Sequence, residues 1–401
     1  MAAKKVIRKF DGVRDFEEGF AVVCIGDKCG YIKPDGSWLI EPKFSDVQDF
    51  SEGFAAVKLA GKYGFIKPDG SWLVEPKFDI VEDFHEGFAA VKLAGKWGFI
   101  KSDGSWLVEP KFDLIGDAHF QGFKEGFASV CLDGKWSFIK SDGSWLIEPK
   151  FDDVGEHLAT YRVFKEGFAR VKLDGKWGFI KSDGSWLVEP KFDYADNFEN
   201  GSAPVRLDGK YGFIKTDGSW LIEPKFDGAG NFESDGFAKA RSGWYLRGCI
   251  KPDGSWAVEP KFLRIGLFHN GAALVETSRS NFGVIKPDGS WLIEPTFTDA
   301  GEDFSEGFAR VKLGCKWGYI KTDGSWLIEP KFDEAGDFSE GFARVKLGGK
   351  YGYIKTDGSW LVEPRSIKWG YPFHNGLAIV ETSSDYRFLK SDGSWMVGSD
   401  E

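Results

Sequence analysis

The sequence predicts an all-β protein built from about eleven short antiparallel meanders that follow one another along the chain. Three observations lead to this fold class. The letters DGSW occur eleven times, at steps of 34 to 41 residues, which indicates tandem repeats. Short apolar runs alternate with Gly-containing turn signals in nearly every copy. No segment places helix-forming residues at a helical period. The eleven tryptophans are Trp38, Trp72, Trp106, Trp145, Trp186, Trp220, Trp256, Trp291, Trp326, Trp360 and Trp395.

A typical copy runs from Phe78 to Pro110 and predicts three strands. EGFAAVKL is rich in strand formers, and the AG that follows suits a two-residue hairpin turn because Gly tolerates positive φ. KWGFIK is the second strand, and SDG is a turn that ends on Gly. SWLVEP is the third strand, and its Pro ends the ladder because it has no N–H to donate. The segment KFDIVEDFHEG then leads to the next copy, with room for a fourth short strand.

The hairpin turn fixes the expected register, which pairs Val57 with Gly64 across the first two strands. The expected register across the next turn pairs Phe65 with Leu73. Alternation then assigns two faces, and both are apolar. One face contains Ala55, Val57, Leu59, Gly64, Ile66, Trp72 and Val74, and the other contains Phe54, Ala56, Tyr63, Phe65 and Leu73, with Lys58, Lys67 and Glu75 at the rim. A sheet that is apolar on both sides has to be covered twice, so neighbouring sheets are expected to stack, with the Gly leaving room for the Trp indole.

The repeated phrases GKWGFI, GKYGFI and GKWGYI resemble those of the WG-repeat proteins, a family of bacterial β-rich repeat proteins. The preceding EGFA and the following DG and P.F elements match as well, from about Phe10 to Val397. The chain departs from the pattern at Cys29 and in the stretch GWYLRGCI. The resemblance implies a β-rich repeat array of poorly defined function, and it transfers no catalytic residue.

The expected architecture is an open superhelical, β-solenoid-like array of stacked three-stranded meanders, because eleven units of about 35 residues exceed an ordinary propeller. A closed ring or propeller-like toroid is the alternative. Residues 1–401 are expected to form one continuous array, with longer inter-repeat segments near 113–126 and 152–167.

Composition narrows the classes of partner. The net charge of −10 argues against nucleic acid, and no apolar run is long enough to span a membrane. Without an apolar leader segment, a cytoplasmic location is expected. Cys24 and Cys29 face each other across a hairpin and are expected to be reduced in the cell, although a bridge is geometrically conceivable.

The motifs favour a binding protein over an enzyme. The sequence has no metal-binding or cofactor-binding motif in a supporting context, so neither metal nor cofactor is expected. The predicted function is a non-enzymatic binding or scaffold protein that presents a repetitive aromatic and charged surface to a protein partner. A multivalent carbohydrate-binding, lectin-like protein is the alternative.

Two sets of residues are candidates for binding. The first set comes from two copies, FHNGAALVETS and FHNGLAIVETS, which depart from the repeat pattern in the same way. Both have Glu where other copies have a recurrent Lys, which reverses the charge at that position. The first set consists of His269, Asn270, Glu276, Thr277, His374, Asn375, Glu381 and Thr382. The second set is a row of second-strand aromatics, for which packing between sheets is the other interpretation: Tyr63, Trp97, Trp136, Trp177, Tyr211, Trp317 and Tyr351.

Overall fold

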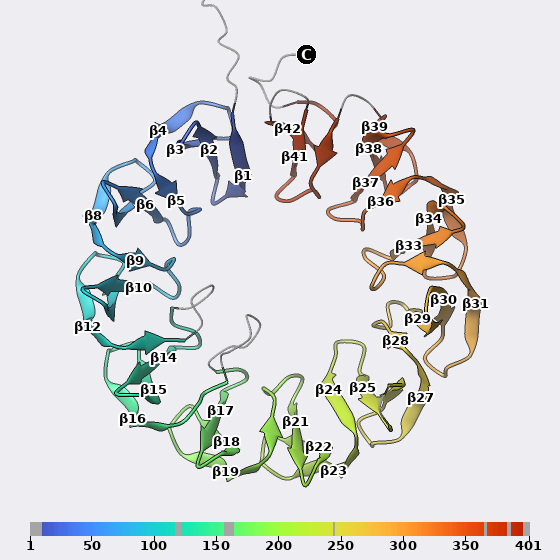
Figure 1. The fold of residues 1–401 in the computed structure, drawn as a ribbon, viewed down its shortest axis with the longest axis horizontal. Helices are drawn as coiled ribbons and strands as arrows, with labels where there is room; N and C mark the ends of the chain where they lie inside the picture. The colour runs from blue at the N-terminus through green and yellow to red at the C-terminus, as the bar shows by residue number, and fades with distance from the viewer. Residues whose placement is uncertain are drawn as a thin grey trace, which may run out of the picture. The chain divides into compact units, whose positions relative to one another are not determined.

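The computed structural model describes residues 10–116, 122–155, 164–243, 245–364, 367–382 and 386–395. Within these ranges every regular element is a β-strand (Figure 1), and no helix is present that could cross a membrane. Parts of the two longer inter-repeat segments, 117–121 and 156–163, lie outside the described residues. The prediction of an all-β protein is therefore confirmed for the described chain.

The described strands form eleven antiparallel sheets, which we call blades 1 to 11 in chain order. Blades 1 to 6 contain β1 (Gly12–Glu17), β2 (Phe20–Ile25), β3 (Lys28–Ile32), β4 (Trp38–Phe44); β5 (Asp46–Val47), β6 (Ala55–Leu59), β7 (Lys62–Ile66), β8 (Trp72–Phe78); β9 (Ile80–Val81), β10 (Phe88–Leu93), β11 (Lys96–Lys101), β12 (Trp106–Phe112); β13 (Leu114–Ile115), β14 (Phe127–Leu132), β15 (Lys135–Lys140), β16 (Trp145–Phe151); β17 (Phe168–Leu173), β18 (Lys176–Lys181), β19 (Trp186–Phe192); and β20 (Tyr194–Ala195), β21 (Ser202–Leu207), β22 (Lys210–Lys215), β23 (Trp220–Phe226).

Blades 7 to 11 contain β24 (Gly228–Phe232), β25 (Ala238–Arg241), β26 (Arg247–Ile250), β27 (Trp256–Phe262); β28 (Arg264–Ile265), β29 (Ala273–Ser278), β30 (Asn281–Ile285), β31 (Trp291–Phe297); β32 (Asp299–Ala300), β33 (Phe308–Leu313), β34 (Lys316–Lys321), β35 (Trp326–Phe332); β36 (Glu334–Ala335), β37 (Phe342–Leu347), β38 (Lys350–Lys355), β39 (Trp360–Val362); and β40 (Trp369–Gly370), β41 (Leu377–Glu381), β42 (Tyr386–Lys390).

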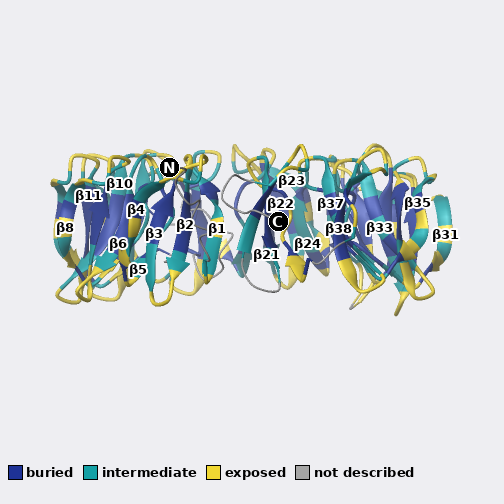
Figure 2. Ribbon diagram, turned by 90° about the horizontal axis from the view of Figure 1, so that it is seen from above, coloured by how far each residue is buried: buried dark blue, intermediate teal, exposed yellow. Residues whose placement is uncertain are grey.

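Most blades have four strands, which corrects the expected three. In blade 3 the strand order is β12-β11-β10-β9, and the extra strand is the two-residue β9, which pairs with β10 through Val81 and Val91. The connecting segment supplies this strand because its Ile and Val can extend the ladder for two residues before the chain turns. Figure 2 shows the buried residues within the strands and the exposed residues mainly in the turns at their ends.

The chain divides into two compact units, one made of residues 1–42, 241–251 and 255–401, and the other of residues 43–240 and 252–254. In the first unit, blade 1 packs directly on blade 11. Phe16 and Val23 share a buried cluster with Ile379 and Phe388, although these pairs come from opposite ends of the chain. Terminal sheets of an open superhelix would each leave one apolar face uncovered, whereas here each covers the other. The predicted open, solenoid-like array is therefore wrong, and the fold is a β-propeller with eleven blades.

The register of the first hairpin is confirmed, and that of the second is corrected. Val57 lies opposite Gly64, as expected, but Phe65 pairs with Val74 rather than Leu73 because the ladder is irregular at this point. Val74 therefore lies on the face of Phe65, where it joins the cluster between blades 2 and 3. A bulge inserts residues into one strand, so alternation counted through it assigns the following side chain to the wrong face.

The glycine of the second strand is required for a different reason from the one expected. A Cβ built on Gly64 would lie 2.5 Å from the carbonyl oxygen of Val74 and 2.7 Å from the nitrogen of Pro76. The irregular strand β8 thus approaches β7 so closely that a Cβ at Gly64 would clash with its backbone. In blade 4 a serine occupies this position, and the Ser137 hydroxyl donates to the Ile147 carbonyl.

The tryptophans of the DGSW turns pack between consecutive blades. Trp106 of blade 3 meets Phe78 of blade 2 edge to face, with the ring centroids 5.9 Å apart. The turn before it is held by Asp103, whose carboxylate accepts hydrogen bonds from the backbone N–H of Ser105 at 2.8 Å and from its hydroxyl at 2.6 Å. The aspartate is therefore a turn residue, and it fixes the start of the third strand.

Cys24 and Cys29 occupy directly opposed positions in β2 and β3, as the sequence predicts. They form a disulfide, so the expectation of free thiols differs from the structure. The other cysteines, Cys131, Cys249 and Cys315, are not disulfide-bonded.

Candidate functional site

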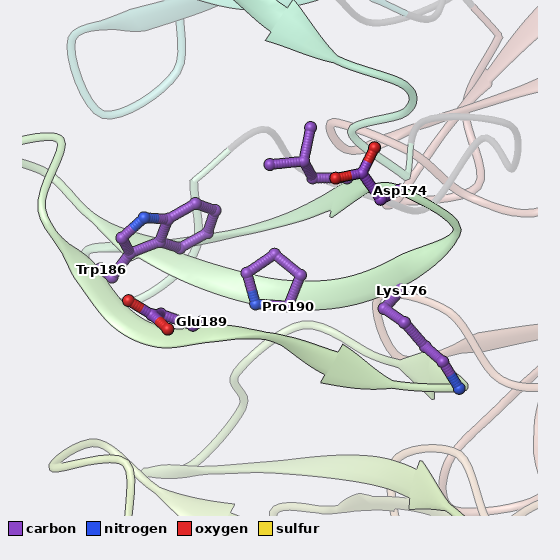
Figure 3. Close-up of a pocket in the computed structure, with 6 residues that line it drawn as sticks. Asp174, Lys176, Trp186, Glu189 and Pro190 are labelled. Atoms are coloured by element: carbon purple, nitrogen blue, oxygen red, sulfur yellow. The ribbon is translucent and has the colours of Figure 1, made fainter.

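A groove of about 320 Å³ opens on blade 5 (Figure 3). Trp186, Glu189 and Pro190 of β19 line one part of it. Leu173, Asp174 and Lys176, from the hairpin between β17 and β18, line the rest. Trp186 and Leu173 are half-buried and the charged side chains are exposed, so the groove combines an apolar floor with a charged rim.

The local geometry explains why the groove forms at this point. In β19, Val188 pairs with Phe179, whereas Phe192 pairs with Trp177, so the ladder contains surplus residues between them. Glu189 and Pro190 belong to this surplus stretch, which leaves the glutamate side chain exposed. A Cβ on Gly178 would lie 2.6 Å from the Val188 carbonyl oxygen, so the bulge rests directly on the second strand.

The charges of the groove are not balanced. The Lys176 ammonium pairs with Asp193 at 2.7 Å, and the backbone N–H of Gly209, in the next blade, donates to the same carboxylate at 3.3 Å. The hydrogen bond from Lys176 is the largest of the effects that lower the pKa of Asp193. Among the residues that the structure describes, neither Glu189 nor Asp174 forms an ion pair, so the unpaired charge of the side chains that line the groove is negative.

The indole of Trp186 already carries a cation from the same chain. The Lys150 ammonium of blade 4 lies 5.5 Å from the centroid of the Trp186 ring, and Phe151 contacts the ring edge to face at 6.0 Å. An ammonium at this distance from an aromatic face is a cation–π contact. Blade 4 therefore supplies both an aromatic support and a positive charge to the groove of blade 5.

The residues of this groove recur along the chain. A half-buried DGSW tryptophan is followed three residues later by an exposed glutamate and then by proline in ten copies. The ten glutamates are Glu41, Glu75, Glu109, Glu148, Glu189, Glu223, Glu259, Glu294, Glu329 and Glu363. The sequence analysis interpreted this Glu-Pro pair only as a strand end. The recurrence of an exposed carboxylate beside an indole is the signal that could have identified the groove.

Comparison with known families matches the whole array. The model described as "WG containing repeat" matches residues 4–29, 30–63, 63–97, 97–136, 136–177, 177–211, 211–243, 248–277, 282–317, 317–351 and 351–383. The chain belongs to the WG-containing repeat family. The resemblance seen in the sequence is thereby confirmed.

The chain is also similar to solved structures of low sequence identity. No curated protein matches the chain. Among solved structures, a eukaryotic initiation factor is similar with a TM-score of 0.41 and 10% identity, covering 76% of this chain and 93% of its own. Kluyveromyces lactis Hsv2p is similar with a TM-score of 0.31 and 11% identity, covering 60% of this chain and 92% of its own.

The second-strand aromatics, which include the Trp of each WG dipeptide, lie within the packed sheets. Trp97, Trp177 and Tyr351 are 6%, 9% and 4% exposed. Tyr63, Trp136, Tyr211 and Trp317 are half-buried. Charged side chains of the first strand cover several rings, as Lys92 does at 5.5 Å from Trp97. The structure therefore places this row between WG repeats, with little ring surface left for a ligand at its three buried members.

The first set of candidate binding residues is divided, in blade 8, between the two ends of a strand. His269 and Asn270 lie in the turn before the six-residue β29, and Glu276 and Thr277 lie near its far end. At about 3.3 Å per residue, more than 20 Å of chain separates His269 from Thr277. The Thr277 hydroxyl donates to the Asn281 carbonyl at 3.2 Å. These WG-repeat residues do not form one patch in blade 8.

The matching residues of blade 11 are also separated, and they have defined contacts. His374 and Asn375 lie before β41, and Glu381 and Thr382 lie at its end. Glu381 pairs with Lys368. The His374 imidazole lies 3.0 Å from the Glu17 carboxylate, and the Asn375 amide donates to the Phe16 carbonyl at 2.9 Å. In this WG repeat the change from Ser-Glu to His-Asn therefore serves the contact with blade 1.

A row of carboxylates that the sequence analysis missed connects successive WG repeats. The Glu52 carboxylate accepts hydrogen bonds from the backbone N–H groups of Glu86 and Gly87, each at 2.7 Å. Glu86 repeats this with the turn of blade 4, at 2.7 and 2.8 Å. These turn residues have positive φ, which directs their N–H groups toward the neighbouring blade. Among the described residues, no group of three or more His, Cys, Asp or Glu side chains is placed to hold a metal.

Proposed function

We propose that this chain is a non-enzymatic scaffold that binds extended protein segments through its repeated grooves. One observation carries the proposal, namely that the Trp, Glu and Pro that line the groove of blade 5 recur in ten copies, with the Glu exposed in each. Equivalent sites on one chain raise avidity without new kinds of contact. An active site, in contrast, needs a unique arrangement of acid, base or nucleophile.

The charge of the groove favours a basic segment. Glu189 and Asp174 are exposed at the rim, and Lys176 is already paired with Asp193. The net charge of the chain, −10, adds a long-range attraction for positively charged partners. Lysine and arginine side chains also have long apolar stems, which suit the leucine side chain and the proline ring of the groove.

The same geometry disfavours the carbohydrate alternative. A sugar ring is held by stacking on an open aromatic face. The face of Trp186 is covered by Lys150, with the ammonium 5.5 Å from the ring centroid. The second-strand aromatics are largely covered as well, as the 6% exposure of Trp97 illustrates.

A random-peptide library and a glycan array, both screened with the full chain, test this proposal. We expect Lys- and Arg-rich peptides to be selected and glycans not to be retained. The affinity of a selected peptide is then measured with a variant in which four glutamates are changed to lysine, namely Glu109, Glu148, Glu189 and Glu223. Because exposed ion pairs contribute about 0.2–1 kcal/mol each, four reversals should weaken a multivalent peptide at least about tenfold.

The matched control changes the same four glutamates to aspartate, which keeps the charge and shortens the side chain. It should retain most of the affinity. Selection of glycans, or equal affinity of the Lys and Asp variants, would contradict the proposal.

A further inference from the structure

In each of blades 2 to 5, one lysine reaches from its own blade to the tryptophan of the next. The ammonium groups lie 5.5 Å from Trp106, 5.2 Å from Trp145, 5.5 Å from Trp186 and 6.0 Å from Trp220, measured to the ring centroids. They belong to Lys77, Lys111, Lys150 and Lys191. In blade 6 the equivalent Lys225 donates to the carbonyl of Gly254, in the DGSW turn of the next copy, at 3.0 Å. The chain therefore places this ammonium over an indole in four copies and on a turn carbonyl in another.

Blade 8 does not supply this lysine to blade 9. The third strand of blade 8 reads WLIEPTF, so Thr296 stands where eight other copies have lysine. A threonine side chain is too short to reach across, and in the described chain around this junction no cation lies over the ring of Trp326. The supporting contact is kept, because Phe297 still meets Trp326 edge to face at 5.9 Å. The platform is therefore intact and only the ammonium is missing.

The surroundings of Trp326 are more open than those of the filled copies. Leu313, the counterpart of Leu173 in the groove of blade 5, is 47% exposed, whereas Leu173 is half-buried. Thr296 is itself exposed. The recurrent groove glutamates are present on both sides, as Glu294 of blade 8 and Glu329 of blade 9, and both are exposed. The vacancy is thus reachable from solvent and lies in a region of negative charge.

We infer that Trp326 forms an unfilled lysine site, which takes the ammonium group of a lysine side chain from a protein partner. This inference rests on the proposed function, because it names one residue of the bound segment. The ring face of tryptophan attracts cations more strongly than that of any other side chain. The carbonyl of Gly324 stands where Gly254 stands in the filled copy, and can accept from the same ammonium.

The geometry favours lysine over arginine as the occupant. At the position of Thr296, one copy has arginine, Arg365, and eight copies have lysine: Lys43, Lys77, Lys111, Lys150, Lys191, Lys225, Lys261 and Lys331. The four cations that lie over a DGSW tryptophan all belong to lysine, whose linear stem ends in a compact ammonium. A guanidinium is a wide planar group that prefers bidentate acceptors.

The experiment titrates the full chain, with ¹⁵N-labelled tryptophan, with a short peptide that has blocked ends and one lysine. The Trp326 indole signal is assigned by its loss in Trp326→Phe. We expect this signal to shift on titration. Thr296→Lys restores the array's own residue and should weaken peptide binding at Trp326 at least about tenfold, because the internal lysine competes at a high effective concentration. The same peptide with acetyl-lysine should cause no shift.

The matched variant works in the opposite direction. Lys150→Thr removes the internal lysine from Trp186, and the Trp186 indole should then respond to the lysine peptide although it does not in the parent chain. A Trp326 signal that does not move in the parent, or that moves equally in Thr296→Lys, would overturn the inference. These outcomes are separate from the test of the proposed function, which uses the grooves of blades 3 to 6.

Discussion

The side-chain amide of Asn375 donates a hydrogen bond of 2.9 Å to the backbone carbonyl of Phe16, which joins residues 359 positions apart in the chain. The same bond occurs between consecutive blades, where the Asn200 amide donates to the Phe232 carbonyl at 2.7 Å. Blade 11 therefore contacts blade 1 through the same kind of hydrogen bond that blade 6 makes with blade 7. The contact differs only in that no peptide segment connects the two partners directly.

Asn375→Ala should loosen the contact between the first and last blades. Loss of one hydrogen bond costs about 1 kcal/mol, and here no connecting segment holds the blades together. We expect faster amide hydrogen exchange in β1 and β41, measured by mass spectrometry. Asn200→Ala removes the matching bond inside the chain and should produce a smaller, local change. Unchanged exchange in β1 and β41 would show that the apolar cluster alone maintains this contact.

Gly178→Val should destabilise blade 5. The new Cβ would lie 2.6 Å from the Val188 carbonyl oxygen and 2.7 Å from the Pro190 nitrogen, so the third strand would have to move. Overpacking of this kind costs about 1–3 kcal/mol, and a clash with backbone belongs at the upper end. Chemical denaturation measures the loss. Lys181→Val, at an exposed position of the same strand, is the control, and an equal effect of the two changes would refute the steric explanation.

Trp186→Ala should lower the free energy of unfolding by up to about 3 kcal/mol, below the cost at a fully buried site because the indole is half-buried. Trp186→Phe should cost less, since a ring can still meet Phe151. Thermal denaturation of both variants gives the comparison. A parent-like melting temperature for the alanine variant would mean that this indole contributes to binding and not to packing between blades.

The Lys–Asp pairs should make stability sensitive to acid. The pKa values of Asp79, Asp113, Asp152, Asp193 and Asp333 are lowered from the ordinary 3.8, in each case mainly by a hydrogen bond from a lysine. A lowered pKa stabilises the fold above pH 3.8, and this contribution is lost as the pH falls from 3.8 through the lowered values.

Replacing these five aspartates with asparagine should therefore flatten the loss of melting temperature between about pH 5 and pH 2. The turn aspartates of the DGSW motifs, such as Asp183, also have lowered pKa values but remain in both proteins, so they cancel in the comparison. A variant with the same acid dependence as the parent would show that the Lys–Asp pairs do not contribute.

Much of each repeat could be predicted from local sequence. The positions of the hairpin and DGSW turns follow from Gly and Asp chemistry, and the pairing of Val57 with Gly64 follows from the hairpin length. Prediction failed at the third strand, because a bulge leaves no periodic signal in the sequence. Val74 was therefore assigned to the wrong face, and the reason for Gly64 was attributed to the indole instead of the Val74 carbonyl.

The candidate site was less predictable than the repeat. The tryptophan and the Glu-Pro pair are evident in ten copies, but the groove of blade 5 depends on the surplus residues of the third strand, which expose the glutamate. The sequence analysis instead selected the second-strand aromatics, which period-two alternation places beside charged residues. Packing of the neighbouring blade covers these rings, and no pattern within one repeat reports on that neighbour.

The sequence by itself determined the repeat, its strands and turns, and the need for each sheet to be covered on both faces, because these depend on interactions between residues close along the chain. Only the tertiary structure decided what covers the outer faces of blades 1 and 11. That outcome depends on packing between the two ends of the chain, which no pattern within one repeat reports. The pairing of Phe16 with Phe388 is the result, and it distinguishes a propeller from an open array.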